Sequence, residues 1–138
     1  MGIALPQSVK DLLEDKAYGF IVTQKPDGAP QITMVWMDVD GDTPQFNTAE
    51  GREKPANLRN NPNIIVTGQS KADPQAYAAI YGKATVTTDG ADANIDKLAK
   101  RFMGLDAYPY RQDGEQRVLV KIDVEKVRGA GPGMQPWS

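Results

Sequence analysis

Residues 46–66 read FNTAEGREKPANLRNNPNIIV, a stretch whose structural pattern changes twice. Its first residues end the segment 44–48 (PQFNT), which follows an Asp-Gly-Asp turn and predicts a short β-strand. Proline is common at the first helical position, so Pro55 predicts one or two helical turns over 53–61. Residues 63–70 return to β-branched side chains. The stretch therefore predicts a strand, a short helix and a second strand.

The same stretch predicts an anion site at the start of its helix. Free backbone N–H groups at a helix start attract anions, and Arg52 and Lys54 add a forked donor and a point charge. Thr48 and Asn57 can donate further hydrogen bonds. The alternative is an exposed loop whose two basic side chains are merely solvated, and composition alone favours that interpretation.

Upstream of this stretch, the pattern is that of β-hairpins. Residues 17–24 are rich in aromatic and β-branched side chains and stop at a Lys-Pro-Asp-Gly turn signal. A second strand is expected over 31–38, and after another turn the chain reaches the strand at 44–48. Before the hairpins, apolar residues at helical spacing predict a short helix over 7–15, with Ser8 as its N-cap.

Downstream, the chain adds two strands and one clear helix. Residues 77–88 predict a fifth strand, and 116–127 predict a last strand with alternating side chains. Between them, apolar residues recur at helical spacing over 90–103, and Gly104 fits the C-cap. The Gly/Pro-rich segment 129–133 is not expected to form regular structure.

Six strands and three helices predict a mainly β fold, with one domain over residues 1–138. Hairpin connections make the sheet mostly antiparallel, which favours a small closed or partly closed barrel with helices over its openings. The strand at 31–38 is apolar on both faces, so one face can fill the barrel and the other needs a cover. A partner subunit is the simplest cover and predicts a homodimer; the alternative is that the helices cover this face.

The composition excludes several classes of site. The chain has 138 residues with no cysteine and no histidine, which removes thiol nucleophiles, Ser-His-Asp triads and histidine-ligated metals. A carboxylate-only metal site stays possible in principle, but no metal site is predicted. Sixteen basic against eighteen acidic residues argue against nucleic-acid binding or a polybasic membrane surface as the main role. No apolar run suggests a membrane span or signal peptide, so a cytoplasmic protein is expected.

Five segments stand in order across the chain: TQKPDGAPQITMVWMDVDGD (23–42), FNTAEGREKPANLRNNPNIIV (46–66), IYGKATV (80–86), IDKLAKRFMG (95–104) and VRGAGPGM (127–134). In residues, order and spacing they resemble the split β-barrel flavin/deazaflavin superfamily, often named after pyridoxamine 5′-phosphate oxidase. Through GREKPANL and GAGPGM the chain looks closest to the branch that uses the deazaflavin coenzyme F-420.

The resemblance implies a six-stranded split β-barrel of the FMN-binding type, forming a homodimer with two cofactor sites at the subunit interface. Arg52 and Lys54 match the positions that hold the cofactor phosphate, and Asn57 lies on the same short helix. Two strands match those beside the tricyclic ring and before the phosphate site, and they contribute Gln31, Thr33, Met34, Val35, Asn47 and Thr48. At Met34 the family often has a small residue or proline.

The implied activity is that of an oxidoreductase transferring a hydride from reduced coenzyme F-420, an 8-hydroxy-5-deazaflavin, to a small organic substrate. FMN is the alternative cofactor, because both molecules share the phosphate end. A non-catalytic flavin- or deazaflavin-binding protein is a further alternative, because no catalytic residue is identifiable. The candidate proton donors are candidates by residue type only: Tyr77, Tyr81, Tyr108 and Tyr110.

Several residues outside these matches also carry expectations. Trp36 is expected in the core or in the dimer interface, because its neighbours are apolar. The polar side of the helix at 90–103 is expected to face water, with Lys97, Lys100 and Arg101. Arg111 could reach the acidic oligoglutamate tail of the coenzyme. The C-terminal residues that could line the substrate pocket are Pro132, Gly133 and Trp137.

Overall fold

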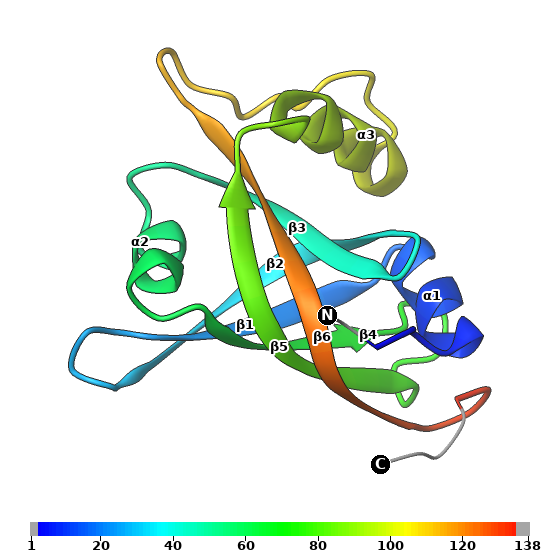
Figure 1. Ribbon diagram of the computed structural model, residues 1–138. Coiled ribbons are helices and arrows are strands. Elements are labelled where there is room, and N and C mark those ends of the chain that lie inside the picture. Colours follow the sequence, from blue (N-terminus) through cyan, green and yellow to red (C-terminus); the bar gives the residue numbers. More distant parts are fainter. Residues whose placement is uncertain (1–2, 135–138) are drawn as a thin grey trace.

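The computed structural model describes residues 3–134, and its sheet closes into a barrel (Figure 1). The strands are β1 (Tyr18–Gln24), β2 (Pro30–Asp40), β3 (Thr43–Ala49), β4 (Asn63–Gln69), β5 (Tyr77–Thr87) and β6 (Arg117–Ala130). Around the barrel they follow the order β1-β2-β3-β6-β5-β4, with β4 paired back to β1. Every neighbouring pair is antiparallel. This topology confirms the predicted mainly β, six-stranded barrel.

Three helices accompany the barrel: α1 (Gln7–Glu14), α2 (Glu53–Asn60) and α3 (Ala91–Met103). Figure 1 shows α1 and α3 near different ends of the barrel and α2 at its side. Gly104 ends α3 in the left-handed conformation, and its N–H contacts the carbonyls of Ala99 and Lys100, which confirms the predicted C-cap. None of the helices in the described part is long and apolar enough to cross a membrane.

The barrel interior is filled by apolar side chains from strands on all sides. Side chains along each strand point alternately into and out of the barrel. The helix α1 covers one end of the barrel with three buried side chains and shields the inward-facing residues from water. Fully burying a large aliphatic or aromatic side chain contributes about 1.5–3 kcal/mol. Central members of this core are Leu13, Ile21, Met37, Phe46, Ile80 and Ile122.

The predicted N-cap of α1 is wrong. The helix begins at Gln7 after Pro6, and Ser8 lies within its first turn, where the hydroxyl makes no hydrogen bond to any described residue. Pro6 provides the start instead, because its carbonyl accepts from the N–H groups of Val9 and Lys10 at 3.0 and 3.2 Å. A proline has a preset φ, so it can start a helix without a side-chain cap.

Two other boundaries also differ from expectation. The helix α2 begins at Glu53, so Pro55 is its third residue and not its first. The N–H groups of the first helical turn have no carbonyl partner within the helix, so a proline at this position removes no hydrogen bond. The strand β6 continues to Ala130, beyond the predicted end. Gly129 and Ala130 stay in the ladder because β5 offers them partners at Ala78 and Tyr77.

A buried carboxylate on β2 ties α3 to the barrel. Asp38 is fully buried, and its Oδ2 accepts from Gln45 Nε2 at 2.7 Å and Asn94 Nδ2 at 2.9 Å. Lys97 Nζ lies 3.1 Å from the same oxygen, and Arg101 Nη1 lies 3.1 Å from Oδ1. We call these five residues the Asp38 cluster. It joins β2, β3 and α3.

The Asp38 cluster corrects the expectation that the polar side of α3 simply faces water. Lys97 and Arg101 pair with a buried anion, whereas Lys100 is exposed as expected. Burial alone would raise the pKa of Asp38, but the hydrogen bond from Gln45 and the charges of Lys97 and Arg101 outweigh it and lower the pKa below its usual value. The carboxylate is therefore held in its charged form.

Exposed apolar side chains gather on the outside of the β1–β2 hairpin, whose tip projects away from the barrel (Figure 1). Phe20 and Met34 face each other across the two strands and are 47% and 55% exposed. Ile32 is 62% exposed, and Ile65 on β4 is 37% exposed. We call these four residues the outer apolar surface. A partner subunit could cover this surface, so the expected homodimer stays a prediction.

Candidate functional site

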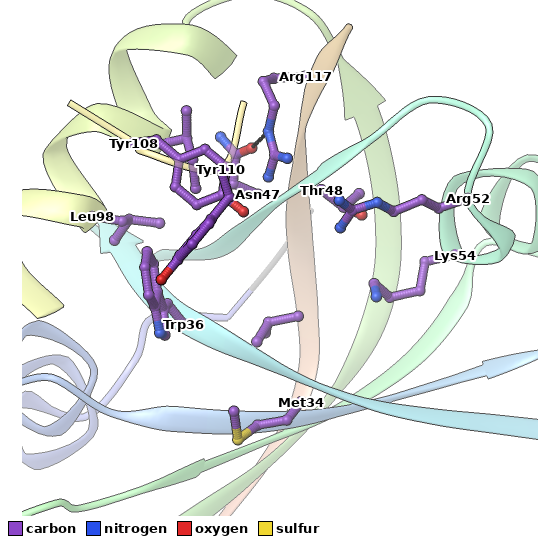
Figure 2. A pocket seen from close by; sticks show the side chains of 12 residues that line it. Met34, Trp36, Asn47, Thr48, Arg52, Lys54, Leu98, Tyr108, Tyr110 and Arg117 are labelled. Carbon is purple, nitrogen blue, oxygen red and sulfur yellow. Dashed lines mark hydrogen bonds between the residues drawn. The ribbon is translucent and has the colours of Figure 1, made fainter. Parts of the chain in front are cut away.

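A pocket of about 180 Å³ opens between β2, β3, the start of α2, α3 and the start of β6 (Figure 2). The loop after α3 closes one side of it. The pocket brings together residues that are up to 83 positions apart in the chain: Met34, Val35, Trp36, Asn47, Thr48, Arg52, Lys54, Ile95, Leu98, Tyr108, Tyr110 and Arg117. Six of the nine predicted cofactor-binding residues are in this set.

One end of the pocket is basic, and we define this basic end as Arg52, Lys54 and Arg117. A single carboxylate, Glu115, lies near two of these cations, with Oε1 3.7 Å from Arg52 Nη2 and 3.4 Å from Arg117 Nη1. Among the described residues, no carboxylate lies within ion-pairing distance of Lys54. Burial and the charges of Arg52 and Arg117 lower the pKa of Lys54. Three cations with one nearby carboxylate leave an excess of positive charge that attracts an anion.

Two buried polar atoms of the pocket lack hydrogen-bond partners among the described residues. Thr48 is 1% exposed, and its Oγ1 makes no hydrogen bond within the described residues. The Nη1 of Arg117 is in the same state. Most buried polar groups are hydrogen-bonded, so such orphans near a cation cluster mark places for ligand oxygens. Arg52, Lys54 and Thr48 thus have the chemistry that a phosphate requires, and their role as its ligands stays a prediction.

Arg117 was not predicted from the sequence. It opens β6, is 2% exposed, and donates from Nε to Asn47 Oδ1 at 2.9 Å. Burial lowers its pKa, and Glu115 partly offsets this effect. Arg117 reaches the pocket because β6 pairs with β3, opposite Ala49. Strand register is a long-range property, so no local signal identified this residue.

The other end of the pocket is aromatic, and we define this aromatic end as Trp36, Tyr108 and Tyr110. The ring of Trp36 stacks on Phe102 of α3 at 5.0 Å and meets Tyr108 edge-on at 6.3 Å. Tyr110 meets Tyr108 edge-on at 5.7 Å. Trp36 is half-buried against α3 and lines the pocket, so it is not a core residue, and its expected place in a dimer interface stays a prediction.

Of the four tyrosines considered as proton donors, the structure brings two to the pocket and leaves two away from it. Tyr108 and Tyr110 form the aromatic end. Tyr77 is 45% exposed at the start of β5, and Tyr81 stacks under Lys126 at 5.3 Å. Ile95 and Leu98 of α3 add apolar cover between the two ends.

Three predicted site residues lie outside the pocket lining. Asn57 is 4% exposed and donates from Nδ2 to Thr23 Oγ1 at 3.1 Å and to Gln31 Oε1 at 3.2 Å. Gln31 also donates to Glu53. These bonds attach α2 to β1 and β2, so Asn57 and Gln31 position the basic end without lining it. Thr33 lies on β2 with a buried, unpartnered Oγ1.

The remaining candidates lie elsewhere. Pro132 and Gly133 line a different hollow beside α1, and not this pocket, while Trp137 lies outside the described residues. Arg111 Nη2 pairs with Asp96 Oδ1 of α3 at 3.1 Å. Its contact with an oligoglutamate tail remains a prediction.

Comparisons with known proteins agree with this architecture. A family model described as pyridoxamine 5′-phosphate oxidase matches residues 5–131. A solved F-420 reductase superposes with a TM-score of 0.74 at 25% identity, covering 89% of this chain and 98% of that protein. General Stress Protein 26 from Bacillus anthracis superposes with a TM-score of 0.66 at 20% identity, covering 89% of this chain and 91% of that protein. A conserved hypothetical protein from Mycobacterium tuberculosis superposes with a TM-score of 0.69 at 18% identity, covering 92% of this chain and 84% of that protein. No curated protein matches the chain.

Proposed function

Because the chain belongs to the pyridoxamine 5′-phosphate oxidase family, we propose that it is a flavin-type oxidoreductase that uses the deazaflavin coenzyme F-420 to reduce a small organic substrate. The observation that carries this proposal is the two-ended pocket. A cation cluster with unpartnered donors suits a phosphate, and an aromatic and apolar wall suits a flat ring system. The likeness to a structure named F-420 reductase supports F-420 as the cofactor.

Different residues of the pocket would contact different parts of such a coenzyme. Arg52 and Lys54 would bind the phosphate, and Thr48 would donate a hydrogen bond from its hydroxyl. Met34 and Val35 would lie along the ring, while Ile95 and Leu98 of α3 would exclude water from it. When bound, reduced F-420 supplies a hydride, so that the acceptor gains two electrons and a proton while the coenzyme is oxidised.

FMN is the second candidate cofactor, because the basic end suits its phosphate equally well. Its phosphate would meet Arg52 and Lys54 just as the phosphate of F-420 would, so the basic end alone does not separate the two. A protein that binds either cofactor without turnover is the remaining candidate. It differs from an enzyme in one measurable way, because it would not speed oxidation of the bound reduced cofactor by any acceptor.

A titration with each cofactor tests the proposal directly. Purified protein, followed by Trp fluorescence or calorimetry, is expected to bind F-420 at least tenfold more tightly than FMN. The phosphate-free compounds 8-hydroxy-5-deazariboflavin and riboflavin keep the ring and the ribityl chain and serve as controls. Tighter binding of FMN would replace F-420 as the cofactor and leave the family assignment intact.

We also propose that two copies of the chain form a homodimer through the outer apolar surface. Large contiguous exposed apolar patches on soluble proteins commonly mark interfaces. The surface borders the pocket, because Met34 belongs to both. The open space of about 180 Å³ in one subunit is smaller than typical ligand pockets, which suits a site completed by a second subunit.

Replacing Ile32 with glutamate tests the homodimer. We expect sedimentation analysis to give the mass of two chains for the wild type and of one chain for Ile32→Glu, because burying an unpaired charge in an interface costs several kcal/mol. Leu105→Glu, at an exposed apolar residue outside the surface, is the matched control and should remain dimeric. A wild type that sediments as one chain at all concentrations would refute the dimer.

A further inference from the structure

Arg117 differs from the other two cations of the basic end by its burial. Its side chain is 3% exposed, against 50% for Arg52. Its Nε is bonded to Asn47, and its guanidinium lies 5.1 Å from the ring centre of Tyr108. A buried guanidinium that keeps its charge requires partners for its remaining N–H groups.

Those partners are incomplete. The nearest anion to Arg117 Nη1 is Glu115 Oε1 at 3.4 Å, which is an ion-pair distance without hydrogen-bond geometry. Charge-assisted N–H···O bonds are usually about 2.7–2.9 Å long. The second oxygen of Glu115 is also buried and unpartnered within the described residues. Glu115 therefore lies close to Arg117 but leaves its Nη1 without a hydrogen bond.

Arg117 shares Glu115 with Arg52 but enters the pocket from β6, on the side of the aromatic end. Figure 2 shows its guanidinium beside Asn47 and Tyr108, at the junction with the aromatic end, whereas Arg52 and Lys54 approach the pocket from the start of α2. A ligand group that reaches Nη1 would thus have its carbon skeleton next to the rings of Tyr108 and Tyr110. Planar π-systems pack well against such rings.

We propose that Arg117 binds the anionic group of the acceptor, and that the acceptor is a planar, conjugated organic acid whose carbon skeleton lies against Tyr108 and Tyr110. This assignment rests on the proposed function, because it takes Arg52 and Lys54 to be occupied by the cofactor phosphate. It gives the pocket two anion subsites. A carboxylate at the second subsite would satisfy Arg117 Nη1 and complete its hydrogen bonding.

Glu115 would then compete with the acceptor. It carries the same charged group as the proposed ligand, it lies near the donor that the ligand would use, and its side chain is only 11% exposed. Neutralising Glu115 would remove this competition and the repulsion between two carboxylates. The structure thus offers one variant that should weaken acid binding, at Arg117, and one that should strengthen it, at Glu115.

Benzoate and benzamide are suitable probes, because they share one planar shape and differ in charge. Their binding is measured by calorimetry or NMR on the cofactor-free protein, and a loss of the benzoate preference in Arg52→Gln would place benzoate in the phosphate subsite and overturn the assignment to Arg117. We expect the wild type to prefer benzoate, Arg117→Gln to reduce this preference about tenfold, and Arg117→Lys to keep part of it. Glu115→Gln should raise benzoate affinity severalfold and leave benzamide unchanged. That variant leaves Arg117 in place, so the test does not depend on how well the Arg117 variants fold.

Arg52→Gln is the matched control, since it removes the same group from the other subsite. It should lower the affinity for F-420 relative to 8-hydroxy-5-deazariboflavin and leave the ratio of benzoate to benzamide unchanged. If Arg117→Gln instead lowers the F-420 ratio, its anion belongs to the cofactor, and the proposal is overturned. An unchanged benzoate preference in Arg117→Gln and Glu115→Gln overturns it as well. The benzoate measurement contains no cofactor, so it stands apart from any failure of F-420 to bind.

Discussion

Replacing Arg52 and Lys54 together with alanine is expected to lower the affinity for F-420 by at least about 100-fold. A hydrogen bond to a charged group contributes roughly 1.5–3 kcal/mol, which is about tenfold or more for each side chain. Lys54 has no carboxylate partner among the described residues, so its charge is free to serve a ligand. Calorimetric titration of the variant measures the loss directly.

The control for this pair is Arg59, a third cation on α2. Its guanidinium makes two hydrogen bonds with Glu50, at 2.7 and 2.9 Å, on the exposed surface. Arg59→Ala should leave F-420 affinity within twofold, because an exposed pair contributes little. Binding of 8-hydroxy-5-deazariboflavin should not fall in any of these variants. If the double variant binds F-420 as tightly as the wild type, Arg52 and Lys54 are solvated surface residues and the phosphate lies elsewhere.

The second large effect concerns Asp38. Asp38→Asn is expected to reduce the free energy of unfolding by about 2–3 kcal/mol, because the buried carboxylate accepts four hydrogen bonds, and bonds to a charged group contribute about 1.5–3 kcal/mol each before the partly exposed Lys97 and Arg101 regain water. Whichever way the amide turns, its NH2 group meets donors, which are Gln45, Asn94 and Lys97 at one position and Arg101 at the other. Urea denaturation followed by far-UV circular dichroism measures the change.

The contribution of Asp38 should also depend on pH in a defined direction. Its pKa is lowered in the folded protein, so its stabilisation is fully present above the pKa of the unfolded chain, near 4, and is lost as the pH falls through the lower folded value. The stability gap between wild type and Asp38→Asn should therefore be constant from pH 5 to 7 and shrink below pH 4. Asp40→Asn, at an exposed carboxylate on the same strand, should show no comparable gap. Equal stability of Asp38→Asn and wild type at pH 7 would contradict the structural role of the cluster.

Local sequence patterns predicted most of the barrel. Every expected strand and helix exists, because short turns and residue spacing are properties of neighbours in the chain. The helix at 90–103 is a clear example: Ile95 and Leu98 recur at helical spacing, and Gly104 has the conformational freedom that a left-handed cap requires. The end of β6 was missed because a long-range partner decides it, since β5 holds Ala130 in the ladder, whereas the starts of α1 and α2 were missed by one or two residues for local reasons.

The candidate site was predictable only in part, for the same reason. Arg52 and Lys54 belong to one short segment whose motif is local. Arg117 and Tyr108 reach the same pocket through the pairing of β6 with β3 and the packing of α3, which a single sequence does not encode as a pattern. Likewise, Lys97 looks like a surface residue until the buried Asp38 is placed beneath it.

The closure of the barrel has a consequence for how this protein acquires its pocket during folding. The ladder between β3 and β6 joins segments that are far apart in the chain, and Asn47 and Arg117 meet across a separation of 70 residues. Such non-local pairings form late and slowly, because a long loop must be ordered before the contact is made. A chain that has formed only its hairpins thus holds Arg52 and Lys54 without Arg117 opposite them. A cofactor that binds only the closed barrel would therefore raise the free energy of unfolding of the whole chain.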